Sequence, residues 1–378
     1  MKRFFSYTIL SFFLLLLPTG QASANNNDSI RLSLLTCAPG EEIYSLFGHT
    51  AIRYENPSQG IDIVFNYGLF SFNTPNFIFR FSLGETDYQL GATDYERFAA
   101  EYAFFGRSVW QQTLNLTDEE KTELIRLLQE NYRPENRVYR YNFFYDNCAT
   151  RPRDKIEESI AGKVIYPAEP QDGSLTFRDI VHQYCKGHPW ARFGIDLCIG
   201  SEADQPITQR QMMFAPFYLM DAFDGAQIKG DSIQRPLITA NELVVDATPE
   251  PDESDWMPTP LQCSLLLFIL TAAATIYGIR RRTGLWGIDL FLFGIAGIVG
   301  CVLAFLALFS QHPAVSSNFL LLVFHPGQLL FLPYIIYCVR KGKKCWYLTL
   351  NLAVLTLFIV LFPVIPQRFD FAVVPLAL

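Results

Sequence analysis

The 378-residue sequence predicts an α+β domain that is exported from the cytoplasm, followed by a four-helix transmembrane domain. Three observations support this fold class. The chain opens with the features of a secretory signal peptide, its first two thirds contain strand-like and helix-like patterns, and its last third holds four long apolar segments.

Residues 1–24 have the three parts of a signal peptide. A basic beginning, MKRFF, precedes an apolar run over residues 7–17, and the sequence ASA at 22–24 supplies the small residues of a cleavage site. The mature chain is therefore expected to begin near residue 25, outside the cytoplasm.

Residues 25–245 form the predicted exported domain, which is long enough to bury a core of its own. Alternating apolar residues predict strands at 30–36, 47–55 and 61–67, and NPSQG between the last two is typical of a turn. Amphipathic helices are predicted at 94–105 and 116–132. Thr117 and Glu120 are placed as a capping box at the start of the second helix.

Residues 246–260, DATPEPDESDWMPTP, have no apolar period and are expected to form a flexible linker. Each apolar segment that follows is long enough to cross a hydrocarbon core of about 30 Å at about 1.5 Å per residue. The predicted membrane helices occupy 261–366 and are 261–279, 285–309, 319–339 and 345–366. Residues 367–378 form a short tail.

Basic residues predict the orientation of these helices. Arginines at 280–282 follow the first helix and a basic cluster at 340–344 follows the third, whereas the loop 310–318 has no Lys or Arg. By the positive-inside rule both basic loops are cytoplasmic, and the exported domain, the loop 310–318 and the tail are outside. The signal peptide requires the same topology. We therefore expect a multi-pass protein of the inner (cytoplasmic) membrane with its α+β domain in the periplasm.

Charge and cysteine content argue against several classes of protein. A net charge of −7 and a pI near 5.3 give no basic surface for nucleic acid. Cys185 and Cys198 are close enough in sequence to form a disulfide in an oxidising periplasm. Together with His182 and His188 they match no common zinc spacing, so we expect neither a metal nor another cofactor.

The stretch YNFFYDNCATR, residues 141–151, contains the predicted nucleophile. Asn147 is a good helix N-cap, which would place Cys148 at the start of a helix. The positive end of the helix dipole would lower the pKa of the thiol there, as a nucleophilic cysteine requires. Because of Pro152, either the first turn is distorted or the regular helix begins nearer Thr150.

A thiol nucleophile needs a base, and His49 is the best placed of the five histidines. It stands in the strand-like segment FGHTAIRYE, from which it can face a cysteine on a helix. Asn66 lies on the next predicted strand, and in a hairpin its side chain could orient the imidazole. Asp62 is the rival for this role, and an ordinary strand Asn is the third possibility.

Several stretches of the chain resemble the Bacteroides-type lipoprotein N-acyltransferase family, Lnb. They are TCAPGEEIYSLFGHTAIRY (36–54), VFNYGLFSF (64–72), LNLTDEEK (114–121), YNFFYDNCATRPRD (141–154) and PWARFGIDLCIGSEAD (189–204), with a multi-span tail. The paired GH and DNC motifs are the specific part. The resemblance implies a permuted papain-like periplasmic domain, similar to NlpC and lecithin retinol acyltransferase folds, with His49 and Cys148 as the catalytic pair.

The resemblance also implies a reaction in two halves. Cys148, deprotonated by His49, attacks an ester of a membrane phospholipid and becomes an acyl thioester. The free α-amine of a diacylglyceryl lipoprotein then takes the acyl group. The implied partners are a phospholipid acyl donor, a diacylglyceryl lipoprotein acceptor and the membrane that holds both, with no nucleic acid.

Three further residues are candidates for substrate binding. Arg151 follows the nucleophile and is well shaped to bind a phosphate headgroup, although an ion pair with Glu157 or Glu158 is an equally good interpretation.

The other two candidates, Asn318 and His325, lie in the membrane domain. HPGQ at 325–328 interrupts the third apolar segment, and polar groups at that depth usually face a bundle interior or a cavity. Together they would shape lateral access for acyl chains. The alternative is a proline kink whose freed carbonyls are satisfied by Gln328.

Two other functions are compatible with parts of this pattern. A cysteine peptidase or amidase that acts on cell-wall peptide would use the same Cys148 and His49, but it needs less anchorage than four membrane helices. A non-enzymatic envelope protein would merely bury Cys148, and its Cys148→Ser variant would be silent.

Overall fold

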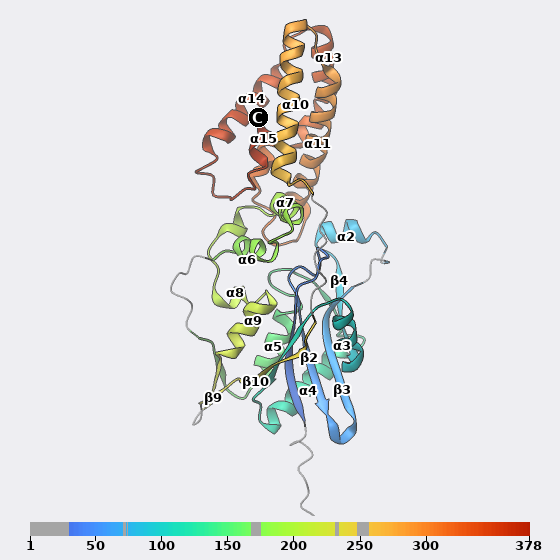
Figure 1. The fold of residues 1–378 in the computed structure, drawn as a ribbon, viewed down its shortest axis with the longest axis vertical. Coiled ribbons are helices and arrows are strands. Elements are labelled where there is room, and N and C mark those ends of the chain that lie inside the picture. The colour runs from blue at the N-terminus through green and yellow to red at the C-terminus, as the bar shows by residue number, and fades with distance from the viewer. Residues whose placement is uncertain (1–29, 71–72, 74, 168–174, 231–233, 248–256) are drawn as a thin grey trace, which may run out of the picture.

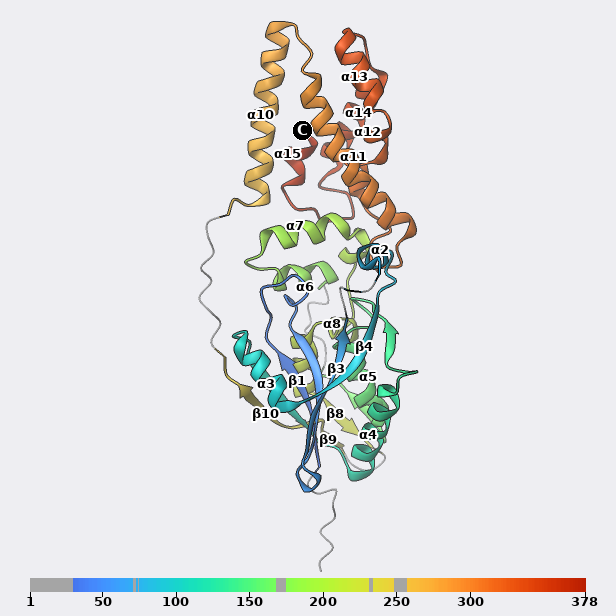
Figure 2. The same cartoon turned by 90° about the vertical axis from the view of Figure 1, so that its right-hand side faces the viewer.

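The computed structural model describes residues 30–70, 73, 75–167, 175–230, 234–247 and 257–378. The predicted signal peptide and most of the predicted linker lie outside these residues. The described chain is elongated, with a sheet-containing domain at one end and a group of helices at the other (Figures 1 and 2). This arrangement confirms a mixed α and β domain followed by a helical one.

A seven-stranded antiparallel sheet with the order β10-β5-β1-β2-β3-β4-β6 forms the centre of the first domain. Its strands are β1 (Arg31–Cys37), β2 (His49–Asn56), β3 (Ile61–Leu69), β4 (Asp87–Asp94), β5 (Val109–Leu114), β6 (Val138–Arg140) and β10 (Ile238–Val245). The three predicted strands are confirmed as β1, β2 and β3, and the predicted turn is the short 3-10 helix η2 (Pro57–Gln59). A smaller antiparallel sheet consists of β7 (Lys163–Ile165), β8 (Gln227–Lys229) and β9 (Gln234–Pro236).

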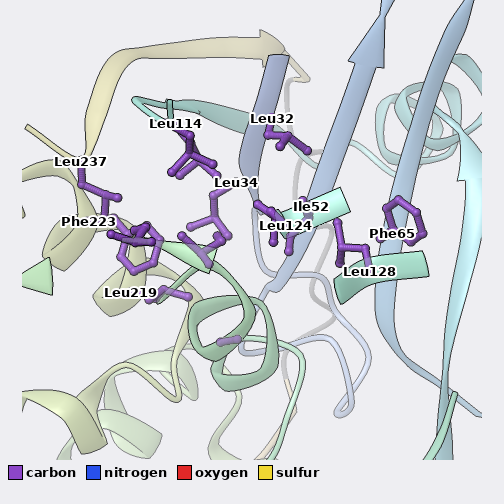
Figure 3. Close-up of a cluster of buried hydrophobic side chains, with 14 of the residues drawn as sticks. Leu32, Leu34, Ile52, Phe65, Leu114, Leu124, Leu128, Leu219, Phe223 and Leu237 are labelled. Carbon is purple, nitrogen blue, oxygen red and sulfur yellow. The ribbon is translucent and has the colours of Figure 1, made fainter. Parts of the chain in front are cut away.

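Helices cover both faces of the large sheet. The helices of this domain are α2 (Phe77–Leu83), α3 (Tyr95–Phe104), α4 (Asp118–Tyr132), α5 (Thr150–Ser159), α6 (Phe177–Tyr184), α7 (Pro189–Cys198), η3 (Ser201–Asp204), α8 (Gln209–Met212) and α9 (Pro216–Asp224). Because successive strand residues point to opposite faces, Leu34 and Ile52 pack with α4, α5 and α9, whereas Leu35 and Ala51 pack with α3. Figure 3 shows the larger of these two cores, with Leu124 of α4 among the strand side chains.

The helix predicted at 116–132 is confirmed as α4. Its capping box is complete, because the Thr117 hydroxyl accepts a hydrogen bond from the Glu120 N–H and the Glu120 carboxylate accepts one from the Thr117 N–H. The predicted apolar stripe of Leu124, Leu127 and Leu128 is buried. Signals within the segment itself therefore determine this helix.

A layer made of α6 and α7 lies between the sheet and the helical domain (Figure 2). Arg178 of α6 is completely buried and pairs with Asp196 of α7 at 2.6 Å and with Asp204 of η3 at 2.8 Å. Arg368, near the end of the chain, also contacts Asp204 at 3.0 Å. A buried guanidinium must keep its partners, so these contacts fix the layer relative to the helical domain.

The first two predicted membrane helices are confirmed as α10 (Pro260–Arg281) and α11 (Trp286–Phe309), which are long and apolar enough to cross a membrane. The third predicted helix is broken. Its first part contains η4 (Phe319–Leu322) and α12 (Pro326–Leu330), and it meets α13 (Leu332–Lys341) at an angle of 72°. Pro326 and Pro333 lack the N–H that a continuous helix needs.

The fourth predicted helix, α14 (Trp346–Leu361), has only 16 residues. By length and composition, the described residues contain two helices that can cross a membrane, or three if the bent pair is one span. The predicted number of four is therefore not confirmed.

The two basic turns of the helical domain lie together. The Arg340 guanidinium lies over the Trp286 ring, 5.3 Å from its centroid, and a Cβ built on Gly284 would lie 2.7 Å from the Val339 side chain. Both turns are at the end of the helices remote from the sheet (Figure 2). This placement agrees with a topology in which both turns are on the same side of the membrane.

The tail at 367–378 is folded against the helical domain. It ends in α15 (Val373–Ala377), where Val373 and Ala377 are buried in a cluster with Leu303 of α11 and Phe358 of α14. The end of the chain is therefore part of the domain core.

Candidate active site

His49 is the first residue of β2, at the end of the sheet that faces α6 and α7 (Figures 1 and 2). Gly48 before it has φ of +75°, and a Cβ there would lie 2.6 Å from the Cys37 carbonyl oxygen, so the turn requires glycine. The His49 Nε2 atom lies 2.5 Å from the side-chain oxygen of Asn66 across the β2–β3 hairpin. Because an amide oxygen only accepts, Nε2 donates this hydrogen bond and Nδ1 is the basic nitrogen.

Asp62, the rival to Asn66, is engaged elsewhere. Its two carboxylate oxygens accept hydrogen bonds from Nε and Nη2 of Arg53 at 2.8 and 2.7 Å. Asp62 stands opposite Glu55, close to the turn of the hairpin and remote from the start of β2. The structure therefore places Asn66, and not Asp62, against His49.

An irregularity in β3 makes room for the site. The pairing of β3 with β4 shifts between Asn66 and Leu69, and Gly68 within this bulge has φ of +93°. A Cβ built on Gly68 would lie 3.5 Å from the Cβ of Cys148 and 3.9 Å from Cε1 of His49. The two predicted catalytic side chains thus both lie beside Gly68, which has no side chain to occupy the space next to them. This residue was not predicted, although a glycine inside the strand-like run VFNYGLF is the signal of a bulge.

Asn147 fixes the turn that carries the predicted nucleophile. Its side-chain oxygen accepts hydrogen bonds from the N–H groups of Ala149 and Thr150 at 2.8 and 3.0 Å. Its side-chain NH₂ group donates to the carbonyls of Phe143 and Phe214 at 2.8 and 2.9 Å. Asn147 therefore caps the turn that leads into α5, whereas the N-cap residue of α5 itself is Ala149, which has no side-chain cap. The buried amide uses its two donors and two acceptor positions.

The regular part of α5 begins at Thr150, so Cys148 lies in the turn directly before it. Pro152 is the third residue of this helix, where a backbone N–H has no partner within the helix. Of the two predicted geometries, the later helix start is the one that the structure shows.

Burial dominates the pKa values at the site. It raises the pKa of Cys148 to about 11, although the N–H groups of Thr50 and of Cys148 itself stabilise the thiolate. Burial also lowers the pKa of His49 to about 4, against the effect of the hydrogen bond with Asn66, and the positive charge of Arg107 lowers it further. The predicted lowering of the thiol pKa is therefore wrong, because desolvation outweighs the N–H groups at the helix start. At pH 7 the resting pair is neutral.

Three tyrosines, Tyr88, Tyr139 and Tyr141, lie near the thiol. Burial raises their pKa values, and the next cause for each is the nearby Cys148, with the pKa of Tyr88 reaching about 12. The Tyr139 hydroxyl is buried and has no hydrogen-bond partner among the described residues. Because such orphan groups are rare, this hydroxyl is a candidate donor for the reaction. None of the three was predicted, although Tyr139 and Tyr141 alternate in the segment that leads to Cys148.

Arg151 already has partners in the structure. Its guanidinium donates two hydrogen bonds to Asp146 at 2.6 and 2.8 Å and lies over the Tyr139 ring, 3.6 Å from the centroid. The alternative ion pair with Glu157 or Glu158 is not formed, because those carboxylates pair with Arg210 and Lys155.

Asn318 and His325 lie in the helical domain and bond to neighbours there and in α7. The Asn318 side chain donates to the Leu197 carbonyl at 2.7 Å and accepts from the Leu320 N–H at 3.0 Å. His325 Nε2 lies 3.2 Å from the Asn351 side-chain oxygen.

The kink at HPGQ has the hydrogen bond that the alternative interpretation expects. The side chain of Gln328 donates to the Val323 carbonyl at 2.8 Å, and Gln328 is buried. This bond satisfies a backbone group that the interrupted helix leaves without an intrahelical partner.

The other cysteines and histidines of the domain have separate surroundings. Cys185 and Cys198 are free thiols, so the disulfide that their spacing allowed is not present. Cys185 is buried in the core of the α6–α7 layer, and His182 lies 2.9 Å from Asp196. Among the described residues no group of three or more His, Cys, Asp or Glu side chains is arranged to hold a metal ion.

Comparison with known families gives two matches. Residues 20–182 match the Lnb N-terminal periplasmic domain, and residues 252–378 match the Lnb transmembrane domain. The comparison with curated proteins gave no match, and neither did the comparison with solved structures.

The fold and the matched domains define a membrane protein with a periplasmic domain of mixed α and β structure. The chain belongs to the Lnb family, and this membership indicates a membrane enzyme that modifies lipoproteins.

Proposed function

We propose that the protein is a lipoprotein N-acyltransferase that carries the acyl group on Cys148. The donor is a membrane phospholipid, and the acceptor is the N-terminal amine of a diacylglyceryl lipoprotein. The observation that supports this proposal best is that His49, hydrogen-bonded to Asn66, and Cys148 both lie beside Gly68. This site lies at the end of the sheet nearest the helical domain, as an enzyme with two membrane-bound substrates requires (Figure 2).

In the first half-reaction, the Cys148 sulfur attacks the ester carbonyl of the phospholipid while His49 Nδ1 accepts the thiol proton. The attack by sulfur and the proton transfer are coupled, because neither the thiolate nor the imidazolium is stable at rest. The pKa is about 11 for Cys148 and about 4 for His49. When the C–O bond breaks, the imidazolium returns its proton to the departing glycerol oxygen. The products are a lysophospholipid and an acyl thioester of Cys148.

In the second half-reaction, the neutral α-amine of the lipoprotein attacks the thioester carbonyl. His49 takes a proton from the attacking nitrogen, the C–S bond breaks, and the proton returns to the sulfur. The products are an amide and the original thiol. At the start of each half Asn66 accepts the hydrogen bond from Nε2–H, which leaves Nδ1 of the neutral imidazole as the basic nitrogen.

Donors for the tetrahedral intermediates are close to the sulfur. The N–H groups of Thr50 and Cys148 stabilise negative charge there, and the Tyr139 hydroxyl has no other partner among the described residues. We propose that the Cys148 N–H and the Tyr139 hydroxyl stabilise the oxyanion.

The wider architecture in this proposal is a permuted papain-like domain, in which the His strand precedes the Cys helix, on an inner-membrane anchor with four crossings over residues 261–366. The bent segment with α13 counts as one crossing. Both basic turns lie at the same end of the helical domain, which supports an even number of membrane crossings between the first turn and the second.

The predicted binding residues have more limited roles in this proposal. A headgroup phosphate can use Arg151 only by replacing Asp146 as its bidentate partner. If the Arg151→Ala variant uses phospholipid as well as the wild type does, Arg151 is not a binding residue. For Asn318 and His325 we propose a role in shaping lateral access for acyl chains. Full activity of a variant in which both His325 and Gln328 are replaced by alanine would refute this role.

The test of the proposed function is the intact mass of a diacylglyceryl-cysteine lipopeptide after incubation with the full-length protein and phospholipid. A gain of one acyl group is expected for the wild type and for Cys198→Ala, a matched control with another half-buried periplasmic thiol. Cys148→Ala should give no gain. An absence of acyl transfer by a folded wild type would refute the proposal and direct attention to cleavage of cell-wall peptides by the same residues.

A further inference from the structure

A groove lies where the periplasmic domain meets the membrane helix α11. One wall is α2, with Phe77, Ile78 and Phe79, and the other is α11, with Val302 and Phe305. Its volume is about 890 Å³, within the range of about 300–1,000 Å³ that is usual for small-molecule sites. The lining is almost entirely apolar, so the groove fits an apolar ligand.

The α2 wall is held firmly against the end of α11. The Gln311 N–H donates to the Leu83 carbonyl at 2.8 Å, and His312 Nε2 lies 2.6 Å from the Phe81 carbonyl oxygen. Arg80, the charged residue of α2, pairs with Asp87 at 2.7 Å in the periplasmic domain. The rest of α2 is therefore able to present apolar side chains, and α2 and α11 are adjacent in Figure 2.

Both walls expose apolar side chains where the lipid would be. Ile78 is 80% exposed and Phe79 is 58% exposed, while Val302 on the membrane helix is 52% exposed. Exposed apolar surface of this kind is unfavourable in water and favourable against hydrocarbon. The exposed side chains of both walls are thus suited to contact with hydrocarbon, and an acyl chain that enters the groove stays on apolar surface.

A row of aromatic rings connects this groove with the thiol. Phe77 of α2 stacks on Phe70 with centroids 5.9 Å apart, and Phe70 contacts Tyr88 at 5.0 Å. Tyr88 stacks on Tyr141 at 4.2 Å, and the pKa values of both tyrosines are raised in part by Cys148. Phe70, Tyr141 and Cys148 all pack against the same buried cluster. Aromatic contacts therefore extend without a break from the groove to the residues that pack around the thiol.

We propose that the groove between α2 and α11 binds the tail of the acyl chain that is transferred, with the row from Phe77 to Tyr141 leading its carbonyl to Cys148. The occupant is the donor phospholipid's chain, which stays in place as the thioester after the headgroup has left. This inference rests on the proposed function. It adds a site at which the length of the chain affects the reaction, because the tail must lie in the groove while the carbonyl is at the sulfur.

The test uses Val302→Trp, which fills the groove from its lipid-facing wall. Ile298→Trp is the matched control, since Ile298 is on the same helix, is 56% exposed and does not line the groove. Full-length protein is incubated with phospholipids of defined short or long chains. The acyl thioester on Cys148 is then measured by intact mass.

Val302→Trp should shift the preference toward short chains by about tenfold or more, the range in which apolar pockets discriminate chain length, and Ile298→Trp should match the wild type. An unchanged chain-length profile in Val302→Trp, with a normal thioester, would overturn the groove assignment and leave the proposed function intact. A shift that follows the chains of the diacylglyceryl acceptor instead of the donor would also overturn it.

A second measurement does not depend on catalysis. Cys148→Ala protein in vesicles is irradiated with a phospholipid that carries a photoreactive group at the end of one acyl chain. Labelling concentrated on residues 77–82 and 301–306 supports the proposal, and labelling spread evenly over the lipid-facing side of α10 and α11 contradicts it. If the wild type forms no thioester but labelling is concentrated in the groove, the proposed function fails and the lipid site stands.

Discussion

Replacement of Asn147 is the sharpest test of how the fold positions the thiol. In Asn147→Ala the N–H groups of Ala149 and Thr150 lose their acceptor, and the carbonyls of Phe143 and Phe214 lose their donor. Loss of an N-cap costs about 0.5–2 kcal/mol, and a buried group left without a partner costs about 1–3 kcal/mol. With one cap and two carbonyls affected, the expected loss in the free energy of unfolding is roughly 3 kcal/mol or more.

Asn147→Ser separates the two contributions. A serine hydroxyl caps a helix about as well as an asparagine amide, but it is too short to donate to both carbonyls. The serine variant should therefore be more stable than the alanine variant by about 1 kcal/mol and remain less stable than the wild type. The difference in the free energy of unfolding between the serine variant and the wild type measures what the hydrogen bonds from Asn147 to the Phe143 and Phe214 carbonyls contribute.

The assay is chemical unfolding of the full-length protein in detergent, followed by the rate of alkylation of Cys148 in the folded state. Both variants should increase the alkylation rate, because the turn loses its link to the core. Equal stabilities of the alanine and serine variants, both within about 0.5 kcal/mol of the wild type, would refute the positioning role of Asn147.

Four further predictions concern the reacting groups. Gly68→Ala should slow thioester formation about tenfold or more, because an alanine at φ of +93° costs about 1–2 kcal/mol and its methyl would contact both the Cys148 and the His49 side chains; a wild-type single-turnover rate would contradict this. Tyr139→Phe should leave the unfolding midpoint unchanged and slow thioester formation roughly 100-fold, as expected for an oxyanion donor; an unchanged rate would show that the hydroxyl is a bystander. Alkylation of Cys148 in the free protein should rise about tenfold per pH unit up to pH about 11, and a plateau between pH 5 and 8 would instead show a thiolate–imidazolium pair. Because the folded protein holds the pKa of His49 near 4, below its ordinary value of 6.5, stability should fall as the pH decreases from 6.5 toward 4, where the unfolded chain binds the proton more readily.

Much of the secondary structure could be predicted because its causes are local. The alternation of apolar residues determined β1, β2 and β3, and the reciprocal hydrogen bonds of Thr117 and Glu120 determined the start of α4. The first two membrane helices follow from length and hydropathy alone. A proline kink at HPGQ was one of two interpretations of the third, but its angle of 72° could not be predicted, because a proline fixes where a helix is interrupted while the packing of its neighbours fixes the angle.

The candidate site was predictable in its residue types and not in its energetics. Asn147 before Cys148 indicated a capped turn, and a hairpin was enough to bring Asn66 toward His49. The direction of the thiol pKa was wrong, since a helix start is a feature of the local sequence whereas desolvation depends on everything that surrounds the sulfur.

The sequence by itself determined the strands beside the site, the capped turn that carries Cys148, the membrane anchor and its orientation signals, because periodicity, capping and charge act within short segments. Only the tertiary structure decided which residues surround the thiol. The bulge at Gly68, the orphan hydroxyl of Tyr139 and the partner of Arg151 depend on chain segments that are far apart in sequence. The groove between α2 and α11 depends on the docking of two domains. Burial and contact between distant segments are set by packing, and no local pattern encodes them.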